Sequence, residues 1–313
     1  MSLTQILMNQ GELGVNLRQS LDKVLPKPNQ FKTQADLPAF NSTYPTLAPH
    51  RLNREDSRLV EIAFNYFLRF ITSKETDIPI DHSSHYFFEA FNYIEEPERS
   101  LVINRLNGYS EKMNDFFISE EIDDYFIAHL YTFAKLDCVA KKRHFDDILD
   151  LKLIEKKTTL AIIEDIKRLG NIYKKVFIGT NIINSDSFII YNPQYSSELE
   201  KKVRGFDSSF FYDGVLLNIK TNRVYSYDTK DVYSLIAQYI FHLIDKALNA
   251  KTELAAEQIE QLALYKARAG QIEFFNVSDL NKMDVYNVSM SVCQTLNIKI
   301  VEENLIQVVS NIY

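Results

Sequence analysis

The residues whose types and spacing could support chemistry gather at 207–221, which reads Asp-Ser-Ser-Phe-Phe-Tyr-Asp-Gly-Val-Leu-Leu-Asn-Ile-Lys-Thr. Asp213-Gly214 between two apolar runs predicts a hairpin, because a two-residue turn requires positive φ at its central positions. Side chains two apart on a strand share a face, so Asn218 and Lys220 point to the same side. Asn218 can offer a carbonyl oxygen to a metal, and Lys220 places a cation beside it.

Other candidate chemistry is weaker. His82 and His85 have a spacing that could bind a metal on a helix, but no third ligand at a matching spacing stands out, which favours a structural or surface role. No Gly-x-Ser-x-Gly elbow occurs, and the 8 glycines form no phosphate-binding loop. Cys138 and Cys293 match no metal-ligand spacing and are expected to be packed, reduced thiols.

Short β-prone segments must position the hairpin residues. Strands are expected at 175–178, 187–191, 209–212 and 215–221. Asp228 then predicts the cap of a helix with a long apolar face. Gln238 lies on that face, where it either points into a site or satisfies a buried backbone group. Further along, a helix is expected at 253–269, a strand at 272–275, a helix at 285–296 and a strand at 298–301.

The first half of the chain is predicted to be mainly helical. From Arg54, apolar residues recur at three- and four-residue steps, which lines one face of a helix. Further helical patterns cover 84–93, 97–114, 120–141 and 158–173. Residues 1–50 are expected to be an extended arm or linker, because five of the eight prolines fall between Pro26 and Pro49.

Composition fits a globular protein. The 313 residues are 46% hydrophobic and 25% charged, enough to bury one large core or two modest ones. The predicted fold class is α/β (α+β), with a helical first half and a mixed-sheet core flanked by helices. We expect an N-terminal arm at 1–50, a helical part at 51–175 and the α/β core at 176–313.

Charge and hydropathy limit the partners. A net charge of −7 argues against coating nucleic acid through bulk positive charge, so only a local basic face could bind it. The candidate basic runs, each of which could instead be solvated surface, are Lys135 with Lys141, Lys142 and Arg143, then Lys201 with Lys202 and Arg204, and Lys220 with Arg223. Without an apolar span or a secretory signal, we expect no membrane partner and a cytoplasmic location.

Six segments occur in the same order as motifs of uncharacterised bacterial proteins with a PD-(D/E)XK, or restriction-endonuclease-like, nuclease fold. They are residues 59–70, 133–137, 192–195, 205–221, 238–239 and 265–270. The chain resembles that family over about residues 50 to 280. The resemblance implies a metal-dependent nuclease core in which acidic residues on two strands hold Mg²⁺ and a lysine stabilises charge on the phosphate.

The site departs from the family pattern. The second hairpin aspartate falls on Ser209 and the aspartate before the lysine falls on Asn218, whereas Asp207, Asp213 and Lys220 keep their types. Asp213 is expected to serve the turn. The residues implied for catalysis are Asp207, Asn218, Lys220 and Gln238, and those implied for a metal are Asp207 and Glu61.

Two functions are therefore expected as alternatives. The first is a degenerate nuclease-like protein that binds nucleic acid, DNA before RNA, with weak or no Mg²⁺-dependent cleavage. The second is a non-catalytic protein-interaction or scaffold subunit of a bacterial assembly such as phage defence. The 21 Phe and 18 Tyr would suit such an interface, and self-association is left open.

Overall fold

The computed structural model describes residues 3–40, 46–47, 52–80, 86–119, 121–142, 144–146, 149–203, 209–222 and 225–312. The chain divides into two compact units. The sheet unit comprises Met1–Pro45, Phe188–Lys220 and Val224–Tyr313. The helical unit comprises Thr46–Ser187 and Thr221–Arg223. The chain is of the mixed α/β class that the sequence predicts, since it combines a mixed sheet with many helices.

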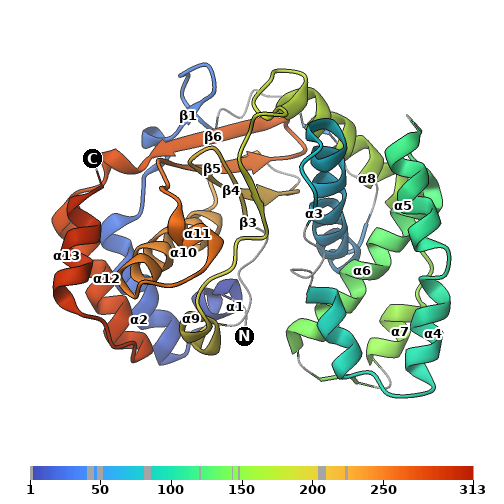
Figure 1. Ribbon diagram of the computed structural model, residues 1–313, viewed down its shortest axis with the longest axis horizontal. Helices are drawn as coiled ribbons and strands as arrows, with labels where there is room; N and C mark the ends of the chain where they lie inside the picture. The colour runs from blue at the N-terminus through green and yellow to red at the C-terminus, as the bar shows by residue number, and fades with distance from the viewer. Residues whose placement is uncertain are drawn as a thin grey trace. The chain divides into compact units, whose positions relative to one another are not determined.

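The sheet unit is built on one six-stranded mixed sheet (Figure 1). The strands are β1 (Lys32–Thr33), β2 (Ile189–Tyr191), β3 (Ser209–Tyr212), β4 (Val215–Lys220), β5 (Gln261–Lys266) and β6 (Gln271–Asn276). Their order across the sheet is β1-β6-β5-β4-β3-β2. β4 and β5 are parallel, and the other neighbouring pairs are antiparallel.

The hairpin predicted at Asp213-Gly214 joins β3 to β4. Both turn residues have positive φ, 43° and 83°, as a tight two-residue turn requires. The Asp213 carboxylate accepts a hydrogen bond from the backbone N–H of Phe188 at 2.8 Å. Asp213 therefore serves the turn and ties it to the start of β2, and Ser209 pairs with Asn218 at the open end of the hairpin.

Helix α10 (Thr229–Ala247) connects β4 to its parallel neighbour β5. A crossover of this kind is needed because parallel strands cannot be joined by a tight turn. The helix begins at the expected cap, where the Asp228 carboxylate accepts the Lys230 N–H at 3.0 Å. α10 packs on β4 and β5 and contacts α1 (Leu3–Met8), α2 (Glu12–Leu21), α12 (Lys282–Leu296) and α13 (Glu302–Ser310).

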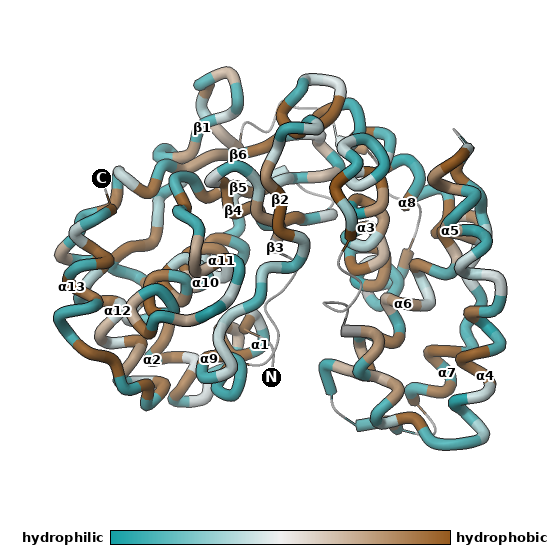
Figure 2. The backbone as a smooth tube through the Cα atoms, viewed as in Figure 1, coloured by the Kyte–Doolittle hydropathy of each residue, from teal (hydrophilic) through white to brown (hydrophobic). Residues whose placement is uncertain are grey.

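The remaining elements of the sheet unit are short. They are α9 (Ser197–Lys202), α11 (Glu253–Ala256) and 3₁₀ turns at Asp22–Val24, Pro28–Gln30 and Val277–Asp279. One hydrophobic core lies between the α10-facing side of the sheet and the helices of the sheet unit. Figure 2 shows long hydrophobic stretches along the strands, as expected for a sheet that is buried.

The helical unit contains α3 (Arg54–Thr76), α4 (Glu98–Arg105), α5 (Tyr109–Ile118), α6 (Asp124–Lys142), α7 (Leu149–Glu155) and α8 (Leu160–Tyr173), with a 3₁₀ segment at Tyr86–Asn92. α3 begins where the Asn53 side chain accepts the Asp56 N–H, and it packs on α6 and α8. Aromatic pairs fill the core, such as Phe87 stacked on Phe133 with ring centroids 4.0 Å apart.

Several expected elements differ from the structure. Residues 3–21, expected to be extended, form α1 and α2. The strand expected at 175–178 is a π-helical extension of α8, Lys174–Ile178. The helix expected at 253–269 stops after α11, and β5 takes its second half. No strand forms at the described residues 298–301, and the helix expected at 97–114 is divided at Gly108.

Among the residues that the structure describes, no helix combines the length and apolar character needed to cross a bilayer.

Candidate functional site

The face of the sheet that packs on α10 changes from apolar to polar along its strands. Residues paired across neighbouring strands point to the same face, so the register defines rows of side chains. The rows, taken along β4, are Leu216 with Leu262 and Phe275, then Asn218 with Leu264 and Glu273, then Lys220 with Lys266. The first row belongs to the hydrophobic core shared with α10, and the polar side chains follow at the carboxyl ends of β4 and β5.

Asn218 is the central polar residue of this face. Its side chain is fully buried, and neither its amide nitrogen nor its carbonyl oxygen has a hydrogen-bond partner among the described residues. A buried amide without partners destabilises a fold by about 1–3 kcal/mol per group. Position 218 therefore carries a buried polar group that forms no hydrogen bond with the described residues of the sheet unit.

Lys220 and Lys266 meet α10 through Asp231, in the first turn of the helix. Asp231 lies 2.7 Å from the Lys266 ammonium and 3.7 Å from that of Lys220. Lys266 and Asp231 are both buried, so this pair is shielded from water and sensitive to the loss of either partner. The contact also fixes the side of β4 on which Lys220, and hence Asn218, lies.

Gln238 shares the sheet-facing stripe of α10 with Asp231 and Ser234, because positions three, four and seven apart lie on one helix face. Its amide nitrogen donates to the Ser234 hydroxyl at 3.3 Å. Its carbonyl oxygen is buried and has no partner among the described residues. Gln238 is expected either to point into a site or to satisfy a buried backbone group. The described contacts of its side chain include no bond to a backbone group.

Glu273 on β6 is a buried carboxyl group that sequence reasoning did not single out. One oxygen accepts the backbone N–H of Phe40 at 3.5 Å, and the other has no hydrogen-bond partner among the described residues. Burial raises the pKa of Glu273 to about 7. The only sequence signal is an acidic residue between Ile272 and Phe274 in a β-prone segment.

The two expected metal ligands are Asp207 and Glu61. Asp207 and the side chain of Ser209 lie outside the described residues, as do His82 and His85. Glu61 belongs to α3 in the helical unit, where its carboxylate accepts the backbone N–H and the hydroxyl of Thr221 at 3.1 and 3.2 Å. Glu61 is therefore already engaged as an acceptor.

The polar side chains on the α10-facing side of the sheet are not suitable ligands for Mg²⁺. This ion favours carboxylate oxygens in octahedral geometry, whereas Asn218 is neutral and Asp231 is held by two lysines. Glu273 is two strands from Asn218, about 10 Å across the sheet at the usual strand spacing. The described residues contain no group of three or more His, Cys, Asp or Glu side chains placed to hold a metal.

The lysines of the predicted basic runs differ in their exposure and in their ion pairs. In the first run Lys135 is buried, Lys141 lies 3.1 Å from Asp137, and Lys142 lies 2.6 Å from Asp150. That run is therefore paired within its own unit. Lys201 and Lys202 are exposed at the end of α9, just before the hairpin in sequence. Arg143, Arg204 and Arg223 lie outside the described residues.

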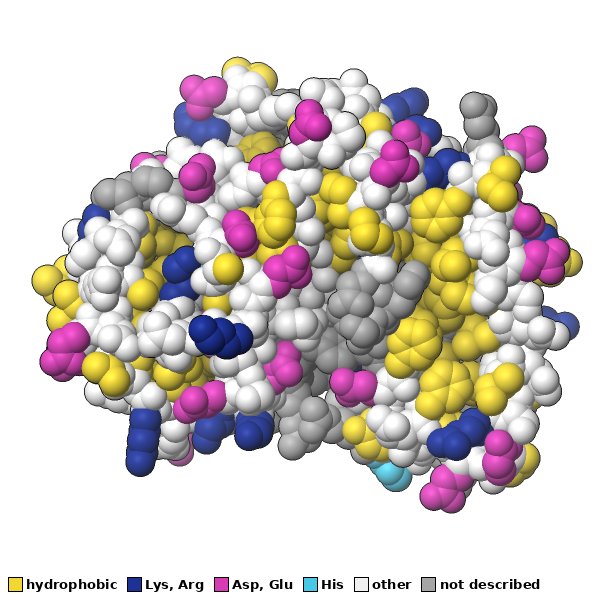
Figure 3. Space-filling view, in the orientation of Figure 1, with side chains coloured by type: hydrophobic (Ala, Val, Ile, Leu, Met, Phe, Trp, Pro, Cys, Tyr) yellow, Lys and Arg dark blue, Asp and Glu magenta, His cyan; other side chains and the backbone are white. Residues whose placement is uncertain are grey.

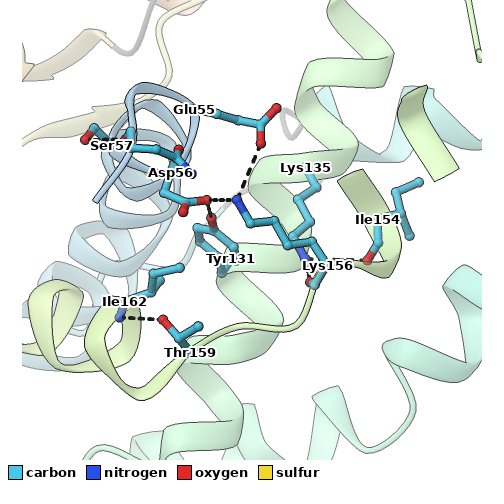
Figure 4. Close-up of polar contacts among 10 residues, drawn as sticks. Glu55, Asp56, Ser57, Tyr131, Lys135, Ile154, Lys156, Thr159 and Ile162 are labelled. Atoms are coloured by element: carbon cyan, nitrogen blue, oxygen red, sulfur yellow. Dashed lines mark hydrogen bonds and ion pairs between the residues drawn. The ribbon is translucent and has the colours of Figure 1, made fainter. Parts of the chain in front are cut away.

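A second polar cluster, in the helical unit, holds helices together (Figure 4). Lys156 pairs with Asp56, whose carboxylate also accepts the Tyr131 hydroxyl at 2.9 Å. Buried Lys135 donates to the carbonyls of Ile154 and Lys156, at the end of α7. Burial, with the nearby cations of Arg105 and Lys156, lowers the pKa of Lys135 to about 8. Its contacts are those of a helix cap.

No protein-family model, curated protein or solved structure matches this chain. Support for a function must therefore come from its own residues and their geometry.

Proposed function

We propose that this protein is a degenerate nuclease of the PD-(D/E)XK type, which binds nucleic acid and cuts it weakly or not at all. The observation that carries the proposal is the orientation of Asn218 and Lys220. Both side chains lie on the α10-facing side of β4, directly after a tight hairpin. The resembling family places an acidic residue and a lysine at these two positions.

The burial of Asn218 adds support. An asparagine chosen only for stability would form hydrogen bonds, and a buried position with no partner would favour an apolar residue. Asn218 has the size of aspartate and forms no hydrogen bond within the described structure. A former metal ligand replaced by its amide accounts for both properties.

Loss of cleavage follows from the donor set. Metal-assisted hydrolysis of a phosphodiester needs carboxylates that hold the ion close to the scissile phosphate. Neutral residues stand at both substituted positions, Ser209 and Asn218. Lys220 remains and supplies positive charge, which suits phosphate binding without cleavage.

Restoring the acidic residues tests the proposal. We would compare the Ser209→Asp/Asn218→Asp variant with the native chain in cleavage of single- and double-stranded DNA and RNA, with Mn²⁺ and with chelator. The variant should gain Mn²⁺-dependent cleavage, and Lys220→Ala in the same background should abolish it. Mn²⁺ should also raise its thermal stability, by about 2.7 kcal/mol at a hundredfold excess over Kd.

Asn276→Asp provides the matched control, because Asn276 is an exposed asparagine at the end of β6 in the same sheet. It should show no cleavage and no stabilisation by Mn²⁺. The proposal is wrong if the restored variant responds to Mn²⁺ no more than this control.

The scaffold alternative rests on a different observation. Large hydrophobic side chains of the helical unit are exposed, among them Ile118 at 87% and Tyr125 at 71%. Figure 3 shows hydrophobic side chains gathered on one face of that unit. Exposed patches of this kind are typical of protein-interaction surfaces. This alternative would be favoured if no nucleic acid binds and if the Ser209→Asp/Asn218→Asp variant shows neither cleavage nor stabilisation with Mn²⁺.

A further inference from the structure

Two adjoining cavities in the sheet unit lie on the side of α10 that faces α13. The inner cavity has a volume of about 200 Å³ and the outer one about 340 Å³. Lys246, Val308 and Asn311 line both, so the two form one continuous recess. Together they reach the size at which pockets hold small molecules.

The inner wall carries a buried imidazole. His242 is 1% exposed, and its Nδ1 atom has no hydrogen-bond partner among the described residues. Burial and the nearby Lys246 lower the pKa of His242 to about 3, so the ring is neutral under physiological conditions. A neutral imidazole can donate through one nitrogen and accept through the other. His242 therefore places a neutral imidazole ring on the wall of the inner cavity.

A lysine lies one helical turn further along the same face. The Lys246 ammonium donates to the carbonyl of Glu257 at 2.7 Å, next to the wall that Gln258 and Ile259 form. An ammonium has three donors, so this bond leaves capacity for a ligand. A second lysine, Lys251, lines the outer cavity and is exposed.

The rest of the lining is rich in side-chain amides. The side-chain amides are Asn249, Gln258, Asn304, Gln307 and Asn311. Among the described residues that line the recess, none is acidic. Lys246 and Lys251 place two cations in a partly enclosed space, where charge is screened less than at an open surface, and the nearby Glu257 carboxylate offsets part of this positive potential.

We propose that this recess binds a small molecule carrying one oxyanion, a phosphate or a carboxylate, on a polar body. Lys246 is the counter-ion of the oxyanion, and the amides of α13 supply further hydrogen bonds. His242 contacts the polar body in the inner cavity. The recess is separate from the cluster of Asn218, Lys220 and Asp231, because His242 and Lys246 lie in the last two turns of α10, whereas Asp231 lies in the first.

Calorimetric titration with three probes tests the proposal: inorganic phosphate, a nucleoside monophosphate and succinate. At least one probe should bind, and the probe with the lowest Kd shows whether the site prefers free phosphate, a phosphate ester or a carboxylate. Lys246→Met should weaken binding about tenfold, the usual effect of losing one charge-assisted hydrogen bond. Because Lys246 also holds the Glu257 carbonyl, Lys251→Gln at an exposed position provides a second test, with an expected loss of about threefold.

Lys299→Gln is the matched control, since Lys299 is an exposed lysine of the sheet unit that lines neither cavity. It should bind as the native chain does. NMR of the imidazole nitrogens adds a direct readout, because ligand binding should shift the His242 signals. The proposal is overturned if no probe binds at millimolar concentration, or if the Lys251 and Lys299 variants bind equally well.

Discussion

Replacing Glu273 by glutamine should remove a pH-dependent loss of stability from the sheet unit. The Glu273 carboxyl is fully buried on β6, and one of its oxygens has no hydrogen-bond partner among the described residues. Burial raises its pKa from 4.5 to about 7. In the unfolded chain the group ionises near its ordinary pKa, while in the folded chain ionisation is opposed until neutral pH.

The sign and size of the effect follow from this shift. A carboxyl whose pKa is raised by folding contributes its full stability below the unfolded pKa and loses it as pH rises through the folded pKa. The difference between about 7 and 4.5 corresponds to roughly 3 kcal/mol at about 1.36 kcal/mol per pH unit. Structural relaxation reduces such values, so we expect about 2 kcal/mol.

Urea denaturation at about pH 5 and about pH 8 measures this difference. Glu273→Gln keeps the shape of the side chain but cannot ionise, so it should gain about 2 kcal/mol relative to the native chain between the two pH values. Glu303→Gln, at an exposed glutamate of α13, should show no such gain. If the Glu273→Gln difference is the same at both pH values, the carboxyl does not titrate as a buried group and the reasoning is refuted.

Three further changes test the packing. Gly170→Ala should destabilise the helical unit by about 1–2 kcal/mol in thermal melts, despite the better helix propensity of alanine, because its Cβ would lie 2.3 Å from the Phe67 ring. Asp231→Asn should lower urea stability by about 3 kcal/mol, because it leaves buried Lys266 without its carboxylate, and an unchanged midpoint would contradict that pairing. Lys135 has its pKa lowered to about 8 from 10.5, so the unfolded chain binds more protons between these values. The free energy of unfolding of the native chain, relative to that of Lys135→Met, should therefore rise by about 2 kcal/mol between about pH 8 and pH 10.5. A difference between the two proteins that does not change with pH would contradict the lowered pKa.

Local patterns predicted the hairpin and the main helices. Asp213 and Gly214 adopt the positive φ values that their residue types favour, and alternation along β4 places Asn218 and Lys220 on one face. The apolar stripe and the capping carboxylate of Asp228 located α10 to within a residue at its start. These features depend on neighbours in sequence, which is why they can be inferred without the tertiary structure.

The errors arise where tertiary contacts override local preference. Residues 261–266 contain Gln, Leu, Ala and Lys, which favour helix, yet they form β5 between β4 and β6. Leu262, Ala263 and Leu264 are all buried, as expected for a strand with both faces covered. At Lys174–Ile178 the opposite occurs, because β-branched and aromatic residues continue a helix.

The missed polar residues have the same cause. Lys266 meets Asp231 because β5 is paired with β4, and Glu273 joins the row of Asn218 because β6 is paired with β5. Because 253–269 is predicted to be a helix, the neighbours of Lys266 and Glu273 across the sheet cannot be inferred from the sequence. Asp231 lies three residues after the predicted cap Asp228, but its ion pairs depend on strands that are distant in sequence.

The most direct test of the nucleic-acid proposal is fluorescence anisotropy of labelled single- and double-stranded DNA and RNA over a range of salt concentrations. We expect the native chain to bind at least one of these polymers at low salt, with affinity falling as salt rises. The double variant Lys201→Gln/Lys202→Gln should lower the salt slope by about 1–2, one phosphate contact per lysine. If none of the four polymers binds even at low salt, the protein is not a nucleic-acid-binding descendant of nucleases.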